Sequence, residues 1–241
     1  LRKVLGEINE PTVSVLIETI IEGLDRMIEI GLPYLQLNRE TPSLSGGEAQ
    51  RLKLVRYMGS SLTGMTYIFD EPSAGMHPRD VYRMNHLLQE LRDKGNTVLV
   101  VEHDKDVIAI ADYIIDVGPE AGQKGGEIVF AGTYPELCRC DTLTGKAMRQ
   151  TLPIKAHPRQ AAGTLPIRDA HLYNLKHVDV DIPLGIMTVV TGVAGSGKST
   201  LISKVFAKQY AQEVVMIDQG PITATNRSTP ASYLGFFDEV R

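Results

Sequence analysis

Helical periodicity marks three segments in the first part of the chain. Across residues 12–30, apolar side chains recur every three or four positions with acidic residues between them, which predicts a helix that packs by one apolar face. Gly31 and Pro33 are expected to end this helix. Similar spacing predicts a helix capped by Ser45 and another helix over residues 80–94.

Short apolar runs predict β-strands. Residues 66–70 and 97–101 are rich in β-branched and aromatic side chains and are expected as strands of a sheet core. Other short runs predict strands at residues 165–167, 178–182, 187–191 and 214–217, with a helix over residues 200–212. Strands and helices that alternate in this way indicate an α/β fold.

A phosphate-binding loop is predicted at residues 192–200, GVAGSGKST, which fits G-x-x-x-x-G-K-[ST] between an apolar run and a helix. Glycines let successive backbone N–H groups point at phosphate oxygens, and the helix that follows adds the positive end of its dipole. Lys198 would bridge the outer phosphates, and the Ser199 hydroxyl would hold Mg²⁺. The expected phosphate contacts come from Gly192, Gly195, Ser196, Gly197, Lys198, Ser199 and Thr200. The alternative is a glycine-rich turn without a ligand.

A second glycine pair stands at the start of a predicted helix. Ser45 is a natural N-cap, and Glu48 would complete a capping box. Ser45, Gly46 and Gly47 could bring backbone N–H groups close to an anion. Taken alone, the spacing also fits a helix that is only well capped.

Carboxylates and a histidine follow the two predicted core strands. Asp70 and Glu71 end the first strand, where ligands bind in an open α/β sheet. Asp70 suits Mg²⁺, and Glu71 could polarise an attacking water. Taken alone, two adjacent carboxylates more often mark a solvated strand end. His103 follows the second strand and could reach a terminal phosphate; a lone histidine is more often structural.

Composition narrows the class of protein. The chain has 241 residues, of which 43% are hydrophobic and 22% charged, values that are ordinary for a soluble globular protein. No apolar run is long enough to span a membrane. The net charge of −4 offers no global attraction to nucleic acid. Cys138 and Cys140 form C-x-C and not the paired C-x-x-C of a zinc site, so no zinc site is expected. His171 and His177 are interpreted as surface or packing histidines.

Four motifs resemble those of the ABC-type ATPases. They are LSGGEAQR at residues 44–51, TYIFDEPSAGMHPRD at 66–80, VVEHD at 100–104 and GVAGSGKST at 192–200, which match the signature, Walker B with D-loop, H-loop and Walker A. Within this class the chain is similar to the UvrA family, the damage-recognition ATPases of bacterial nucleotide excision repair. The segments that carry this similarity are DVGPEAG and GGEIVFAGT at 116–133, NLKHVDVDIPLG at 174–185, and DQGPIT and SYLGFFDEVR near the end.

The resemblance implies a P-loop NTPase fold of the ABC type, with a parallel-sheet core, a small antiparallel β subdomain and a helical signature region. UvrA proteins carry two ATPase modules, so this chain is expected to join the second half of the first module to the first half of the second. Gln219 would be the Q-loop glutamine, which contacts Mg²⁺ and the attacking water. The implied parts are a signature region at 1–65, a Walker B and H-loop half at 66–118, a connector at 119–165 and a Walker A and Q-loop half at 166–241.

Two arrangements of these halves are open. In the family arrangement, Ser45, Gly46 and Gly47 face the nucleotide on this phosphate loop, while Asp70, Glu71 and His103 serve another loop. In the second arrangement the chain is a circularly permuted module, in which the strand at 66–70 lies beside the strand at 187–191 in one parallel sheet. The permuted module is the preferred arrangement here, because one continuous sheet leaves fewer exposed edges than two half-sheets.

The function implied is ATP binding and hydrolysis coupled to recognition of damaged DNA in nucleotide excision repair. Glu71, His103 and Gln219 would be catalytic, and the resemblance also implies excision-repair partner subunits, a homodimer, a cytoplasmic location and no membrane. An alternative is a UvrA-like ATPase of antibiotic resistance, since IDQGPITATNRSTPASY at 217–233 departs from IDQSPIGRTPRSNPATY of the repair proteins. A transporter subunit is a third alternative, against which HPRD at 77–80 counts.

Overall fold

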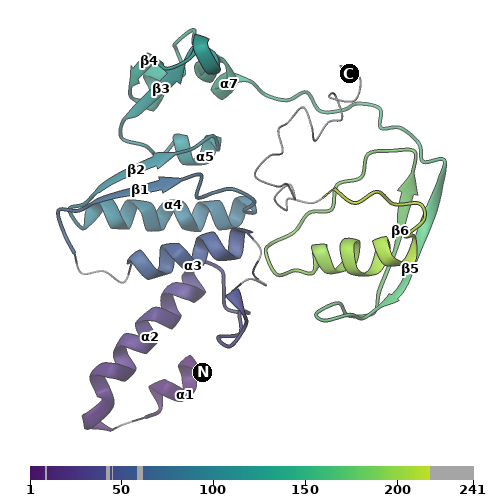
Figure 1. Ribbon diagram of the computed structural model, residues 1–241, viewed down its shortest axis with the longest axis horizontal. Helices are drawn as coiled ribbons and strands as arrows, with labels where there is room; N and C mark the ends of the chain where they lie inside the picture. The colour runs from purple at the N-terminus through teal and green to yellow at the C-terminus, as the bar shows by residue number, and fades with distance from the viewer. Residues whose placement is uncertain (9, 42–43, 45, 59–61, 218–241) are drawn as a thin grey trace, which may run out of the picture. The chain divides into compact units, whose positions relative to one another are not determined.

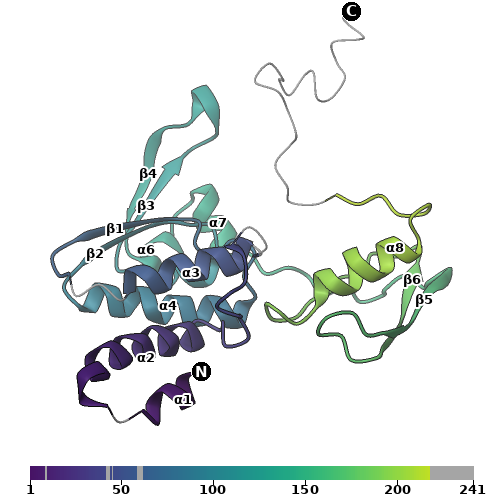
Figure 2. The ribbon, with the colours of Figure 1, turned by 60° about the horizontal axis from the view of Figure 1, so that its bottom comes forward.

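The chain divides into two compact units in its computed structural model, which describes residues 1–8, 10–41, 44, 46–58 and 62–217 (Figures 1 and 2). The first unit is Leu1–Leu165 with Asp181–Lys198. The second is Pro166–Val180 with Ser199–Arg241, of which the residues up to Ile217 are described. Each unit is considered by itself below.

Helices form the N-terminal part of the first unit, together with the first strand of its sheet. The helices are α1 (Arg2–Gly6), the 3₁₀ turn η1 (Pro11–Val13), α2 (Ser14–Glu29), α3 (Gly46–Met58) and α4 (Pro78–Asp93). The helices predicted from apolar spacing are confirmed in α2, α3 and α4. Gly31, which follows α2, has φ +83, a conformation that favours glycine and ends the helix. At the start of α4, His77 Nδ1 accepts a hydrogen bond from the backbone N–H of Arg79, at 3.2 Å.

Strands β1 (Thr66–Asp70) and β2 (Thr97–Val101) pair in parallel, with Thr66 opposite Thr97 and Asp70 opposite Val101. This pair confirms the parallel core. Helix α4 covers one face of the pair, α3 packs on α4, and α2 packs on α3 (Figures 1 and 2). The hydrophobic core lies between these layers and contains Ile30, Leu32, Leu54, Val81, Met84, Leu87, Leu88 and Val107.

A small antiparallel sheet follows the parallel pair, as the family resemblance implies. It consists of β3 (Ile114–Gly118) and β4 (Glu127–Gly132), whose pairing is irregular between Asp116 and Val117. The short helices near it are α5 (Lys105–Ile108), η3 (Gly122–Lys124), α6 (Tyr134–Leu137) and α7 (Leu143–Arg149). The segment predicted as a connector thus contains regular elements, and its longest irregular stretch is residues 150–162.

A third pair of strands, β5 (Gly163–Ala170) and β6 (Val178–Leu184), forms a hairpin. The backbone N–H of Ala162 donates to the carbonyl of Leu184 at its open end, at 3.0 Å. Farther along the chain lie η4 (Thr200–Phe206), a π-type helix, and α8 (Ala207–Gln209). The hydroxyl of Tyr210 donates to the carbonyl of Pro166, which ties this helical segment to β5.

The strands predicted at 187–191 and 214–217 are wrong, because neither run has regular structure. A β-strand needs a hydrogen-bonding neighbour. Within the described residues β1 pairs only with β2, and both apolar runs remain open to solvent, with Met187 90% and Val215 89% exposed. The continuous parallel sheet of a permuted module is therefore not formed in the described part of the chain.

No helix among the described residues combines the length and the apolar character that crossing a lipid bilayer requires.

A buried ion pair joins α3 to α4. Arg51 Nη1 donates to Asp80 Oδ2 at 2.6 Å, and the two side chains are 1% and 4% exposed. Within the described residues, Nε and Nη2 of Arg51 are buried without a hydrogen-bond partner. Asp80 is therefore the group that compensates a charge placed in the core, because a buried charge is costly unless it is paired.

Replacing Asp80 by Asn is expected to lower the free energy of unfolding by about 3–5 kcal/mol, since the substitution leaves the buried guanidinium without its counter-charge. Urea unfolding followed by circular dichroism measures this change. Asp25→Asn is the matched control, because Asp25 forms an exposed pair with Arg2 at the same 2.6 Å distance. The exposed pair is screened by water, so the control should unfold like the wild type. Equal losses in the two variants would show that burial does not set the strength of the Arg51–Asp80 pair.

Candidate nucleotide site

The turn after β1 carries the two predicted carboxylates. Asp70 is the last residue of β1, and Glu71 adopts φ +43 while its N–H donates to the carbonyl of Val101, at 2.9 Å. His103 Nε2 lies 3.5 Å from Glu71 Oε1, and the two side chains are 82% and 55% exposed. The structure thus brings Glu71 and His103 together on an accessible edge, where a carboxylate and an imidazole can orient a water molecule or a phosphate.

Glu102 holds this edge in shape. Its Oε1 accepts the N–H of Ser73 at 2.8 Å, and its Oε2 accepts the N–H groups of His103 and Asp104 at 2.8 and 3.1 Å. Burial disfavours the charged carboxylate, but the hydrogen bonds from Ser73, Asp104 and His103 outweigh it and lower the pKa of Glu102. One side chain thereby fixes the turn after β1 relative to the segment that carries His103.

The start of the signature helix contacts the same turn. A Cβ placed on Gly47 would lie 3.4 Å from the carbonyl oxygen of Gly75, so α3 begins against the turn that follows Glu71. Glu48, which is buried, accepts a hydrogen bond from the hydroxyl of Tyr34 at 2.9 Å. Burial and this hydrogen bond raise the pKa of Tyr34 to about 12. Tyr34 therefore stays neutral and links the segment before α3 to the helix itself.

The phosphate loop has the backbone that its glycines predict. Gly192, Gly195 and Gly197 have φ +147, +73 and +99, values that glycine adopts without strain. The ammonium of Lys198 donates to the carbonyls of Gly192 and Val193 at 2.7 and 2.9 Å, so it arches over its own loop. This curled backbone next to a lysine is the geometry that phosphate binding requires.

The ring of Tyr34 lies directly against the phosphate loop. A Cβ on Gly195 would fall 2.5 Å from two ring carbons of Tyr34, closer than side chains approach one another. Any larger residue at position 195 would therefore require the ring of Tyr34 to shift. Both residues belong to the first unit, so this contact joins the phosphate loop to the segment that leads into α3.

Comparison with known proteins identifies the chain's relatives. The UvrABC system protein A of Staphylococcus aureus (strain COL) is 43% identical over 98% of this chain and 28% of its own length. That of Streptomyces avermitilis is 42% identical over 93% of the chain and 25% of its own length. The crystal structure of UvrA2 from Deinococcus radiodurans matches with a TM-score of 0.86 and 42% identity, covering 96% of this chain and 31% of that one.

The chain is a homologue of the UvrA proteins. It spans about a quarter of the length of the curated relatives that it matches.

Two further matches are more general. The archaeal ribosome recycling factor aABCE1, in a complex with the stalk protein aP1, matches over 99% of this chain with a TM-score of 0.53 and 22% identity, which indicates the fold alone. The family model of the viral superfamily 1 RNA helicase core domain matches residues 188–234, a segment that contains the phosphate loop. Both matches agree with a P-loop ATPase fold for this UvrA homologue.

Two of the predicted site residues, Ser45 and Gln219, lie outside the described residues. Among the others, Glu71 and His103 lie together beside Asp70, whereas Ser199 begins the part of the phosphate-loop helix that belongs to the second unit. The assignment of these residues to one nucleotide or to two stays a prediction.

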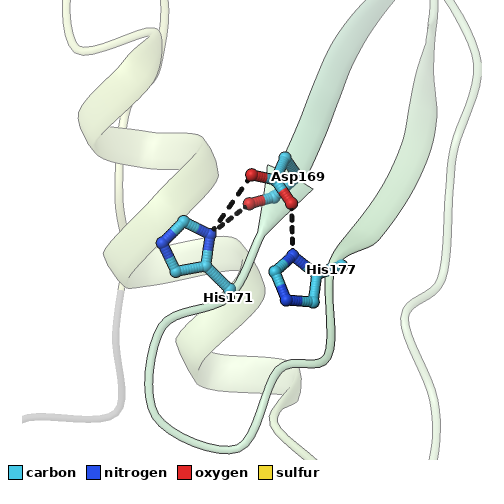
Figure 3. Close-up of side chains that lie close together, drawn as sticks. All are labelled: Asp169, His171 and His177. Atoms are coloured by element: carbon cyan, nitrogen blue, oxygen red, sulfur yellow. Dashed lines mark hydrogen bonds and ion pairs between the residues drawn. The ribbon is translucent and has the colours of Figure 1, made fainter.

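Sequence reasoning missed several residues of this UvrA homologue. Glu102 stood in the H-loop motif without a role, and Tyr34 was not singled out. Asp169, His171 and His177 gather at the end of the β5–β6 hairpin, although the histidines were interpreted as surface or packing residues (Figure 3). Tyr173 is exposed in the same loop. None of these contacts has a spacing that the sequence alone reveals.

Glu102→Gln is expected to lower the free energy of unfolding by about 1–2 kcal/mol at neutral pH, a value discounted for partial exposure of the carboxylate. Because folding lowers the pKa of Glu102, the wild type gains this stability above the unfolded value of 4.5 and loses it as the pH falls through the folded value. The difference between wild type and variant should therefore shrink below about pH 4.5 in urea unfolding series. Glu18→Gln, at an exposed position of α2, is the control. A difference that stays constant down to acid pH would contradict the role assigned to the charged carboxylate.

Proposed function

We propose that this chain contributes ATP binding and hydrolysis to a UvrA-type ABC ATPase that recognises damaged DNA in nucleotide excision repair. The observation that carries the proposal is the phosphate loop, whose left-handed glycines and arched Lys198 form a phosphate cradle. The identity of 43% to proteins named UvrABC system protein A supports the assignment to excision repair. That name also supports partner subunits, and we infer that the protein acts as a homodimer in the cytoplasm.

The contact between Tyr34 and Gly195 supports the family arrangement of the two halves. It joins the phosphate loop to the segment before α3, so Ser45, Gly46 and Gly47 would face the nucleotide held by this loop. A helix N-terminus with two glycines presents N–H groups that suit a phosphate group. We therefore prefer this arrangement to a permuted module, whose sheet is not formed in the described part of the chain.

In this arrangement Asp70, Glu71 and His103 serve a nucleotide on a different phosphate loop. Glu71 would take a proton from the attacking water, and His103, 3.5 Å away, would contact the terminal phosphate. Glu102 holds the backbone that carries the two side chains through its three backbone hydrogen bonds. The catalytic edge is thus prepared before a nucleotide arrives, which favours the transition state.

Residues of the chain also fit the Mg²⁺ that accompanies ATP. Hydroxyl and carboxylate oxygens are ligands that Mg²⁺ prefers, and Ser199 would supply one at the phosphate loop. Asp70 would supply another at its own nucleotide, and Gln219 is proposed for the same task. When bound, Mg²⁺ neutralises phosphate charge.

Lys198→Ala is expected to weaken binding of a fluorescent ATP analogue by about tenfold or more, because a charge-assisted hydrogen bond contributes roughly 1.5–3 kcal/mol. Glu71→Gln should leave the affinity of this loop unchanged, since the carboxylate serves another nucleotide. Lys204→Ala, at an exposed position of the helix that follows the loop, is the matched control for lost charge. Fluorescence anisotropy measures all three affinities.

A parallel loss of affinity in Glu71→Gln and Lys198→Ala would contradict the family arrangement. It would place the two residues at one nucleotide and restore the permuted module. ATP turnover that rises with protein concentration and disappears in both variants would lead to the same conclusion.

The complete protein is expected to bind a duplex with a bulky fluorescein adduct more tightly than the intact duplex of the same sequence. The reason is that a lesion lowers the free energy needed to bend or unstack the duplex. Competition gel shifts at fixed salt compare the two affinities, because salt alone changes affinity for DNA strongly. Equal affinity for the two duplexes would count against a role in damage recognition.

A further inference from the structure

Three side chains that can bind a metal meet at the closed end of the β5–β6 hairpin (Figure 3). Asp169 lies near the end of β5, His171 follows that strand, and His177 directly precedes β6. One ligand atom from each side chain lies within 4.8 Å of the other two. All three side chains are exposed, so a dissolved ion can reach them.

The carboxylate of Asp169 faces the edges of both imidazole rings (Figure 3). His177 Nδ1 is 2.5 Å from one carboxylate oxygen, and His171 Nδ1 is 3.5 Å from the other. The two rings stack with centroids 5.4 Å apart.

The backbone that presents these groups is unusual. Asp169, Tyr173 and His177 have φ +52, +54 and +52, a region that residues other than glycine seldom adopt. The N–H of Asp169 donates to Asp179 Oδ1 at 2.6 Å, and Ala170 next to it is buried. The cluster therefore stands on a fixed strand end, and two of its three members are among these residues with positive φ.

We propose that Asp169, His171 and His177 bind a divalent ion of the zinc, nickel and copper class through two imidazole nitrogens and one carboxylate oxygen. Imidazole selects these metals over Mg²⁺ and Ca²⁺, which prefer oxygen ligands. Metal–nitrogen distances of about 2.0–2.1 Å require the rings to move closer than they stand, by rotation of exposed side chains. Three protein ligands leave a coordination position for water.

The ion would close the loop of residues 171–177 by linking its two ends. Because the ion binds the folded chain, it would raise the temperature of unfolding, and the rise would grow with the logarithm of the metal concentration above the dissociation constant. This site is separate from the chemistry proposed for ATP, which uses none of the three residues. It also revises the expectation of no zinc site, which rested on the cysteines alone.

The test is isothermal titration calorimetry of the chain with ZnCl₂ and NiCl₂ in the absence of nucleotide. We expect saturable binding that a chelator reverses and a rise in the melting temperature that follows metal concentration. His177→Asn and Asp169→Asn should each weaken binding by about tenfold or more, since even a lost supporting contact weakens metal affinity tenfold or more. Asn tolerates positive φ, so both variants keep the backbone of the loop.

His157→Asn, in the irregular segment before β5, is the matched control and should bind metal like the wild type. Circular dichroism without metal checks that each variant folds. Absence of saturable binding by the wild type would overturn the proposal, as would unchanged affinity in both loop variants. Loss of binding in a Cys138→Ser and Cys140→Ser double variant, with binding retained in the loop variants, would assign the metal to the thiols instead.

Discussion

A charge buried in the core sets the geometry of the first unit. Arg51 can lie between α3 and α4 only because Asp80 meets it at 2.6 Å, so the two helices are fixed relative to each other. The chain passes this pair at Gly31, where a Cβ would fall 3.0 Å from Asp80 Oδ1. The helix that follows the LSGGEAQR motif thus packs against the helix that begins in the HPRD motif. As a result, the glycine pair at the start of α3 reaches the turn after β1.

The candidate site combines rigid and exposed parts. Glu102 and the helix start at Gly47 hold the turn after β1 from two sides, while Glu71 and His103 remain accessible. The supporting contacts thus lie beneath the site, and the polar side chains of the site lie at the surface. The same division holds at the phosphate loop, where the ring of Tyr34 supports the backbone and Lys198 stands over it.

The sequence predicted the features that depend on a local pattern of residues along the chain. Apolar spacing located α2 and α4, and the glycines of the phosphate loop have the positive φ that their motif requires. The strands predicted at 187–191 and 214–217 were wrong, because strand formation depends on a neighbouring strand, which apolar character cannot reveal. The roles of Tyr34 and Glu102 come from contacts between segments, and the fold alone determines those contacts.

The catalytic role proposed for Glu71 would compete with stability at that position. A left-handed conformation costs a residue with a Cβ roughly 1–2 kcal/mol, and glycine would avoid most of that strain. A selection for thermal robustness alone would therefore replace this glutamate, whereas a selection for the proposed hydrolysis would retain it. Laboratory evolution of the chain toward heat resistance should accordingly drift to a folded protein that lacks the proposed activity, unless turnover is screened in the same round.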